Sequence, residues 1–148
     1  MQLTLTIDGQ RLIFWGAVLF LVGLLQGVLI PGFENPRMAL SAHLAAVQGG
    51  MVLMIFGVIW SLVLLGPRWL KAAHISAVAS MYLIWSAITL AALLGASKAL
   101  PIAGKGYAAS PMQELVVQGI VLGGGMLGIV SSILLVTGLA RSLRTKVR

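Results

Sequence analysis

Long apolar stretches separated by short polar segments dominate this 148-residue chain. Each stretch is long enough for a helix to cross the hydrocarbon core of a bilayer, which takes ~20 residues. The pattern predicts an all-α fold, an integral membrane bundle of four transmembrane helices at about 12–30, 38–65, 72–97 and 112–140. Because these helices take up nearly the whole chain, we expect a single transmembrane domain over residues 1–148.

Composition agrees with this class. The chain is 59% hydrophobic and 9% charged, with a mean hydropathy of +1.05, whereas soluble domains are roughly 45–50% apolar and ~25% charged. It has no cysteine, which excludes disulfides and thiolate metal ligands. The first apolar run is longer than the ~7–15 residues of a signal-peptide core, and no small-x-small cleavage site follows before Pro31. We therefore expect this run to remain as a helix.

The positive charges predict the topology. Four spans place both termini on one side, together with the basic residues Arg11, Arg68, Lys71, Arg141, Arg144, Lys146 and Arg148. The other side carries Arg37, Lys98 and Lys105. The positive-inside rule then puts both termini in the cytoplasm of a protein of the cytoplasmic (inner) membrane. The last four basic residues are expected to form a tail that contacts membrane lipids, and no nucleic-acid partner is expected.

Two helix starts on the outer side carry capping sequences. Asn35 is an N-cap followed by a proline at the first helical position, and Ser110 is another, with Gln113 as a capping-box partner. The second and fourth helices therefore run inward from the outer side. The loop over 100–110, rich in proline and glycine, is expected to fold over that end of the bundle.

His43 lies inside the second apolar stretch, about 12 Å beyond the Asn35 cap at ~1.5 Å per residue. An ionisable group at that depth is a functional hypothesis by default. The same helix face carries Ala39, Ala46 and Gly50, which would leave a flat slot beside the imidazole. Small residues are equally typical of close helix packing in membranes, and His43 would then only bond a neighbouring helix. Both interpretations stand at this point.

If His43 binds a metal centre, the sequence favours haem over a bare ion. A zinc or di-iron site takes three or more His, Cys, Asp or Glu ligands, and the outer side offers only Glu34 and Glu114 besides His43. A porphyrin supplies four nitrogens, so one axial histidine is enough. The second histidine, His74, is placed at the opposite side of the membrane and is expected to be an interfacial residue.

The stretch from Asn35 to His43, followed by a second outer loop and Gln113-Glu114 at the head of the fourth helix, resembles the hydroxylaminobenzene mutases. More distantly the chain resembles the styrene oxide isomerases. The resemblance covers most of the chain. It implies a membrane isomerase, a homotrimer, that holds ferric haem b through one histidine, which corresponds to His43. It also implies that the iron acts as a Lewis acid on a small aromatic hydroxylamine or aryl epoxide that enters from the lipid, giving an aminophenol or a carbonyl without net redox change.

Two asparagines of the family pattern are replaced here, by Gly49 and by Ile84. Uncharged polar residues at the depth of His43 on other helices are Gln26, Ser86, Thr89 and Gln118. The candidate catalytic residues, which would orient the substrate or line its pocket, are Gln118, Gln48, Tyr82 and Trp85.

The residues expected to hold the cofactor are His43, the small residues Ala39, Ala46 and Gly50, and the charged residues Arg37 and Glu114. Arg37 and Glu114 would reach the haem propionates or pair with each other. Two other functions stay open: a haem-binding membrane protein without catalysis, and a structural or transport bundle without haem.

Overall fold

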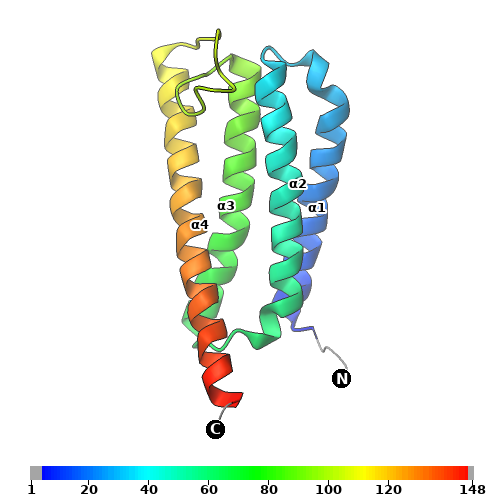
Figure 1. Ribbon diagram of the computed structural model, residues 1–148, viewed down its shortest axis with the longest axis vertical. Helices are drawn as coiled ribbons and strands as arrows, with labels where there is room; N and C mark the ends of the chain where they lie inside the picture. Colours follow the sequence, from blue (N-terminus) through cyan, green and yellow to red (C-terminus); the bar gives the residue numbers. More distant parts are fainter. Residues whose placement is uncertain (1–4, 147–148) are drawn as a thin grey trace.

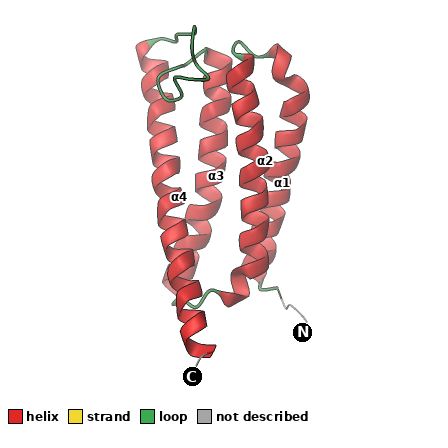
Figure 2. Cartoon of the chain, in the orientation of Figure 1, coloured by secondary structure: helices red, strands yellow, loops and turns green. Residues whose placement is uncertain are grey.

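The computed structural model describes residues 5–146, and this part of the chain is helical with short loops and no strand (Figure 2). Four long helices run up and down: α1 (Ile7–Leu29), α2 (Pro36–Ile59), α3 (Pro67–Leu94) and α4 (Pro111–Lys146). Short 3-10 turns, η1 (Ile30–Gly32) and η2 (Trp60–Leu62), extend α1 and α2. Each long helix is long and apolar enough to cross a membrane. The predicted all-α class with four candidate spans is confirmed.

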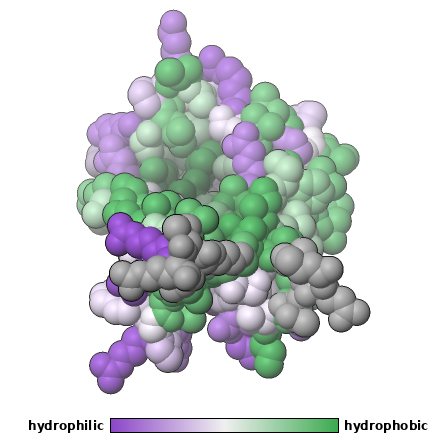
Figure 3. All heavy atoms as spheres, turned by 60° about the horizontal axis from the view of Figure 1, so that its bottom comes forward, coloured by the Kyte–Doolittle hydropathy of each residue, from purple (hydrophilic) through white to green (hydrophobic). Residues whose placement is uncertain are grey.

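The helices lie in chain order rather than around a closed ring (Figure 1). The main contacts join α1 to α2, α2 to α3 and α3 to α4, with a smaller contact between α1 and α3. The two described chain ends lie together at what we call the terminal end. The turn η1 and the loop over 95–110 lie at the opposite loop end (Figure 1). Seen from the terminal end, hydrophilic residues form separate patches on a largely apolar surface (Figure 3).

Local capping moves the helix starts away from the bounds that hydropathy predicts. The first helix begins at Ile7 rather than near residue 12, because the Thr6 hydroxyl accepts a bond of 3.1 Å from the Gly9 N–H. The third begins at Pro67 rather than near residue 72, since proline fits the first helical position. The caps predicted at the loop end are confirmed. The side chain of Asn35 accepts from the Met38 N–H at 3.1 Å.

The capping box at the start of α4 is also formed. The Ser110 N–H donates to Gln113 Oε1 at 2.9 Å, and the Gln113 N–H donates to the Ser110 hydroxyl at 3.4 Å. The loop before it folds over the loop end as expected, since Asn35 Nδ2 donates to the Ala103 carbonyl at 3.0 Å. A Cβ at Gly104 would lie 2.5 Å from the Ser97 Cα, so the loop backbone packs on itself without room for a side chain.

The helix ends differ from the predicted ones as well. The second helix gives way to η2 at Trp60 instead of continuing to residue 65. Beyond η2 the backbone is extended at Val63, and the Leu64 N–H bonds the Gly138 carbonyl of α4 at 3.2 Å instead of a helix carbonyl. The third ends at Leu94, where Gly95 takes a left-handed conformation with φ of 69°. The fourth continues to Lys146, so the predicted basic tail is helical where described, and Arg148 lies outside the described residues.

A line of small residues brings α1 and α2 into backbone contact. A Cβ at Gly9 would lie 2.6 Å from the Gly57 carbonyl oxygen, and one at Gly16 would lie 2.6 Å from that of Gly50. Membrane helices commonly approach this closely along small residues. We call this line the α1–α2 seam, made of Gly9, Gly16, Gly23 and Gly27 on one helix and Gly57, Gly50, Ala46 and His43 on the other. On α2, His43 is the seam residue nearest the loop end.

Candidate functional site

The imidazole of His43 lies against the backbone of α1. Its Nδ1 is 2.7 Å from the carbonyl oxygen of Gly23. Because a carbonyl only accepts, Nδ1 carries a proton, and in the neutral tautomer this leaves the lone pair on Nε2. Gly27 makes room for the ring, since a Cβ there would lie 2.9 Å from both Nδ1 and Cε1. The fold therefore fixes one tautomer and one ring orientation.

The second ring nitrogen of His43, Nε2, is accessible. His43 is half-buried, and Nε2 has no hydrogen-bond partner among residues 5–146. Among the described residues, Nδ1 of His74 is the one buried side-chain nitrogen or oxygen without a hydrogen-bond partner. Nε2 of His43 also lacks a partner, so it is not a buried atom and can be reached from outside the chain. An imidazole with one nitrogen bonded to a carbonyl and the other free has the arrangement of a metal-ligating histidine.

The small residues beside His43 are buried between helices. A Cβ at Gly23 would lie 2.8 Å from the Ala46 Cβ, and Gly50 meets the Gly16 carbonyl, so both Ala46 and Gly50 belong to the α1–α2 seam. Ala39 is fully buried in the apolar cluster that joins α2 and α3 near the loop end. The flat slot expected beside the imidazole is thus filled by α1.

A buried amide of α1 links this helix to α3 close to the histidine contact. Gln26 is 6% exposed and precedes Gly27. Its Nε2 donates to the Thr89 hydroxyl at 3.1 Å, and its Oε1 accepts from the Trp85 indole N–H at 2.7 Å. Two residues of the predicted polar layer, Gln26 and Thr89, are thus in direct contact. Sequence reasoning placed Gln26 in this layer but did not select it as a site residue; its amide in an apolar helix was the available signal.

Tyr82 and Trp85 lie on the same side of α3, towards α1. The hydroxyl of Tyr82 donates to the Trp15 carbonyl at 2.9 Å. The Tyr82 ring meets those of Trp15 and Trp85 edge-on, with centroids 6.3 Å apart in each pair. The structure therefore brings the two predicted aromatic residues together with Gln26 along the contact between α1 and α3.

The other two predicted amides are not brought to His43 within the chain. Both Gln48 and Gln118 are exposed. Gln118 is on α4, which packs against α3 (Figure 1). His43 instead faces α1. Gln48 and Gln118 therefore lie on the outer surface of the chain and not beside His43.

Glu114 and Arg37 each hold the loop at the loop end instead of pairing with each other. Glu114 is 3% exposed, and its two oxygens accept from the N–H groups of Ser97 at 2.9 Å and Lys98 at 3.0 Å. Arg37 is exposed, donates to the Lys105 carbonyl and lies 6.0 Å from the centre of the Tyr107 ring.

Comparison with known proteins identifies the family. The family model described as styrene oxide isomerase matches residues 8–140. Hydroxylaminobenzene mutase HabB of Ectopseudomonas oleovorans is 42% identical over 106 residues, which cover 71% of this chain and 65% of HabB. Hydroxylaminobenzene mutase HabA of the same organism is 39% identical over 103 residues, which cover 69% of this chain and 76% of HabA. No solved structure matches the chain. A family match over most of the four helices, with two relatives near 40% identity, shows that the chain belongs to the styrene oxide isomerase family.

Proposed function

We propose that the protein is a haem-dependent membrane isomerase that rearranges a small aromatic hydroxylamine or an aryl epoxide, with His43 as the axial ligand of ferric haem b. The observation that carries the proposal is the bond from His43 Nδ1 to the Gly23 carbonyl, which leaves Nε2 free and accessible. The two mutase relatives and the family name supply the reaction class, an intramolecular rearrangement.

The donor set fits a haem better than a bare metal ion. The described residues hold no group of three or more His, Cys, Asp or Glu side chains that could bind a metal ion. A porphyrin needs only one protein ligand, and a carbonyl bonded to the second ring nitrogen raises the basicity of a ligating imidazole. When bound, ferric haem would supply a Lewis acid for the substrate oxygen.

The chain itself would orient the ligand and exclude water. Gly27 and the Gly23 carbonyl hold the imidazole against α1. The surrounding apolar surface favours small aromatic substrates from the lipid and limits attack by water on a cationic intermediate. Within the described part of one chain, Gln48 and Gln118 are exposed and neither is bonded to the Nε2 side of His43. We propose a homotrimer in which a neighbouring copy covers this side and brings those amides to it.

The proposed location is the cytoplasmic membrane, with the terminal end inside. Described basic residues at the terminal end are Arg11, Arg68, Lys71, Arg141, Arg144 and Lys146, against Arg37, Lys98 and Lys105 at the loop end. The excess follows the positive-inside rule. Labelling of single cysteines introduced at each end, in intact cells with an impermeant maleimide, tests the orientation.

An absorbance spectrum of the detergent-purified protein tests the haem. The parent should show a Soret band that His43→Ala loses and that added imidazole restores, while His74→Ala keeps it as the matched histidine control. Loaded protein should convert hydroxylaminobenzene to an aminophenol, or styrene oxide to an aldehyde, without an added cosubstrate.

Other outcomes separate the alternatives. A parent that stays colourless after haem supplementation would contradict the haem proposal and leave a structural bundle. A Soret band that depends on His43 but no turnover over both substrate classes would leave a haem-binding protein without catalysis.

A further inference from the structure

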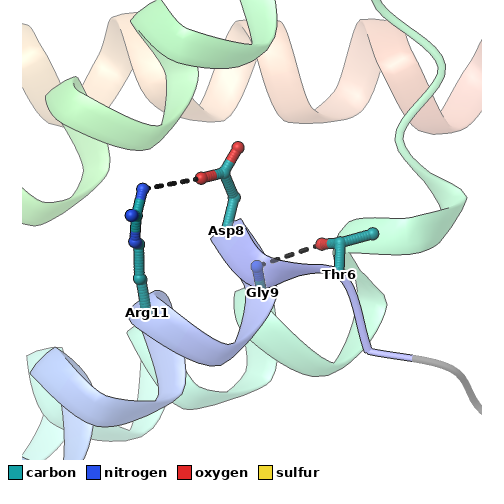
Figure 4. A network of polar contacts seen from close by, with 4 residues as sticks. All are labelled: Thr6, Asp8, Gly9 and Arg11. Carbon is teal, nitrogen blue, oxygen red and sulfur yellow. Dashed lines mark hydrogen bonds and ion pairs between the residues drawn. The ribbon is translucent and has the colours of Figure 1, made fainter.

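A polar recess opens between the first turns of α1 and α3 at the terminal end, far from His43. It has a volume of about 400 Å³, and its polar lining is Asp8, Arg11, Lys71 and His74. Figure 4 shows Asp8 and Arg11 projecting from the first turn of α1, with their side chains paired. Their closest charged atoms are 3.5 Å apart. The reaction proposed above uses none of these residues.

An apolar groove continues from this recess along the helices. It has a volume of about 270 Å³ and is lined by Trp15, Val78 and Ala79, and it shares His74 and Ile75 with the recess. The contact between Tyr82 and Trp15 lies about one turn further along α3 than Val78 and Ala79. The two cavities together form a polar opening with an apolar extension.

The depths of the two parts match the layers of a membrane. Arg11 and Lys71 are each four residues into their helices, about 6 Å from the helix starts at ~1.5 Å per residue. Ala79 is twelve residues into α3, about 18 Å from its start. The charges therefore lie where lipid headgroups are found, and the groove lies at the depth of the acyl chains.

The charge of the recess suits one negative group. Asp8 is neutralised by Arg11, and Lys71 has no ion-pair or hydrogen-bond partner among the described residues, so the lining has one unpaired positive charge. A phosphodiester carries one negative charge and accepts charge-assisted hydrogen bonds from such groups. His74 adds a buried Nδ1 without a partner, with its ring held edge-on to Trp60 at a centroid distance of 5.9 Å.

We infer that this recess and groove bind one anionic phospholipid, with the phosphate at Lys71, the unpaired cation of the recess, and one acyl chain between Trp15, Val78 and Ala79. A zwitterionic headgroup fits less well, since its ammonium group would find Asp8 already paired. A soluble anion would leave the apolar groove without an occupant. The inference rests on the proposed membrane location but not on haem or on catalysis.

Native mass spectrometry of the purified full-length protein tests this site, with phosphatidylglycerol and phosphatidylcholine of the same acyl chains as probes. The parent should retain one phosphatidylglycerol per chain in preference to phosphatidylcholine. Lys71→Gln should weaken the binding of phosphatidylglycerol about fivefold, as expected for one basic residue at an anionic lipid surface. Ala79→Leu, whose side chain fills the groove, should weaken the binding of both lipids. Arg68→Gln and Ala140→Leu are the matched controls, exposed at the terminal end and on α4 respectively, and should bind as the parent does.

Three outcomes would overturn the inference. Equal retention of the two lipids, unchanged by Lys71→Gln, would exclude headgroup recognition. Displacement of phosphatidylglycerol by millimolar glycerol phosphate, with no effect of Ala79→Leu, would indicate a soluble-anion site. An Ala79→Cys variant that crosslinks efficiently between copies would show that a second chain fills the groove. Lipid retention is measured also in His43→Ala, so a failure of the haem proposal is distinguishable from a failure here.

Discussion

Replacement of Gly27 by alanine tests whether α1 positions His43 as a ligand. A Cβ at position 27 would lie 2.9 Å from Nδ1 and from Cε1 of the imidazole. Ordinary carbon contacts lie at about 3.5–4.0 Å, so the ring must withdraw by roughly 0.6–1.1 Å. That movement lengthens the 2.7 Å contact to the Gly23 carbonyl beyond the ~3.2 Å limit of a normal hydrogen bond.

Stability and haem affinity should respond differently to this change. Loss of the hydrogen bond costs about 0.5–1.5 kcal/mol, while alanine in place of glycine inside a helix gains roughly 0.8–1.0 kcal/mol. The free energy of unfolding of the haem-free protein should therefore change by less than about 1 kcal/mol. Haem affinity should fall about 10–100-fold, because the ligating imidazole loses the partner that orients it.

Haem titration followed at the Soret band, in parent and variant, measures the affinity. Gly125→Ala is the matched control, since position 125 is in α4 and a Cβ there would meet nothing within 4 Å. Thermal unfolding of the haem-free forms measures stability. Equal haem affinities in the parent, Gly27→Ala and Gly125→Ala would refute the positioning role of α1. A large loss of stability in Gly27→Ala would show instead that the added methyl group disrupts the packing of α1 against α2 along the seam.

Three further changes test the parts of the fold around the site. Glu114→Gln should destabilise the protein by about 1 kcal/mol, because one of the two part-buried backbone N–H groups that the carboxylate accepts from loses its acceptor. Limited proteolysis of the adjacent loop checks this, with exposed Glu34→Gln cleaved as slowly as the parent. Gln26→Leu should leave an indole N–H without an acceptor and cost about 1–3 kcal/mol, and an unchanged unfolding midpoint would contradict that. Gly50→Ala puts a Cβ 2.6 Å from a carbonyl oxygen and should cost about 1–3 kcal/mol, whereas Gly125→Ala should not lower the melting temperature.

The apolar runs predict the number and class of the helices, but not where they end. A helix terminus depends on whether the first N–H and last carbonyl groups find partners, and hydropathy does not measure this. The starts marked by Asn35 and Ser110 could be predicted because both caps stand in the sequence beside a proline. The early start of α1 at Thr6 and the left-handed Gly95 after α3 have weaker signals, and both were missed.

The sequence predicts the depth of His43 but not the helix that it faces. A helix that is apolar on all sides has no amphipathic stripe to indicate its packed face. Here the close approach along the seam decides the orientation, and it turns His43 towards α1. Depth alone predicts that Gln118 lies beside His43, whereas the structure places Gln118 on the exposed side of α4. Gln26, at a similar depth on α1, is the amide that is buried beside the histidine contact.

The two replaced asparagine positions face different neighbours. A Cβ at Gly49 would lie 3.3 Å from Met81 and 3.4 Å from Leu19, so a side chain there would point between α3 and α1. Ile84 instead packs against Gly124 of α4, 3.0 Å from where a Cβ would be. Amides at these positions in one chain would therefore serve different helix contacts. Gln26 places an amide between α1 and α3 at a different level, bonded to Thr89 and Trp85 and next to Gly27, the glycine that touches His43, so the polar group nearest the histidine contact comes from α1 and not from position 49.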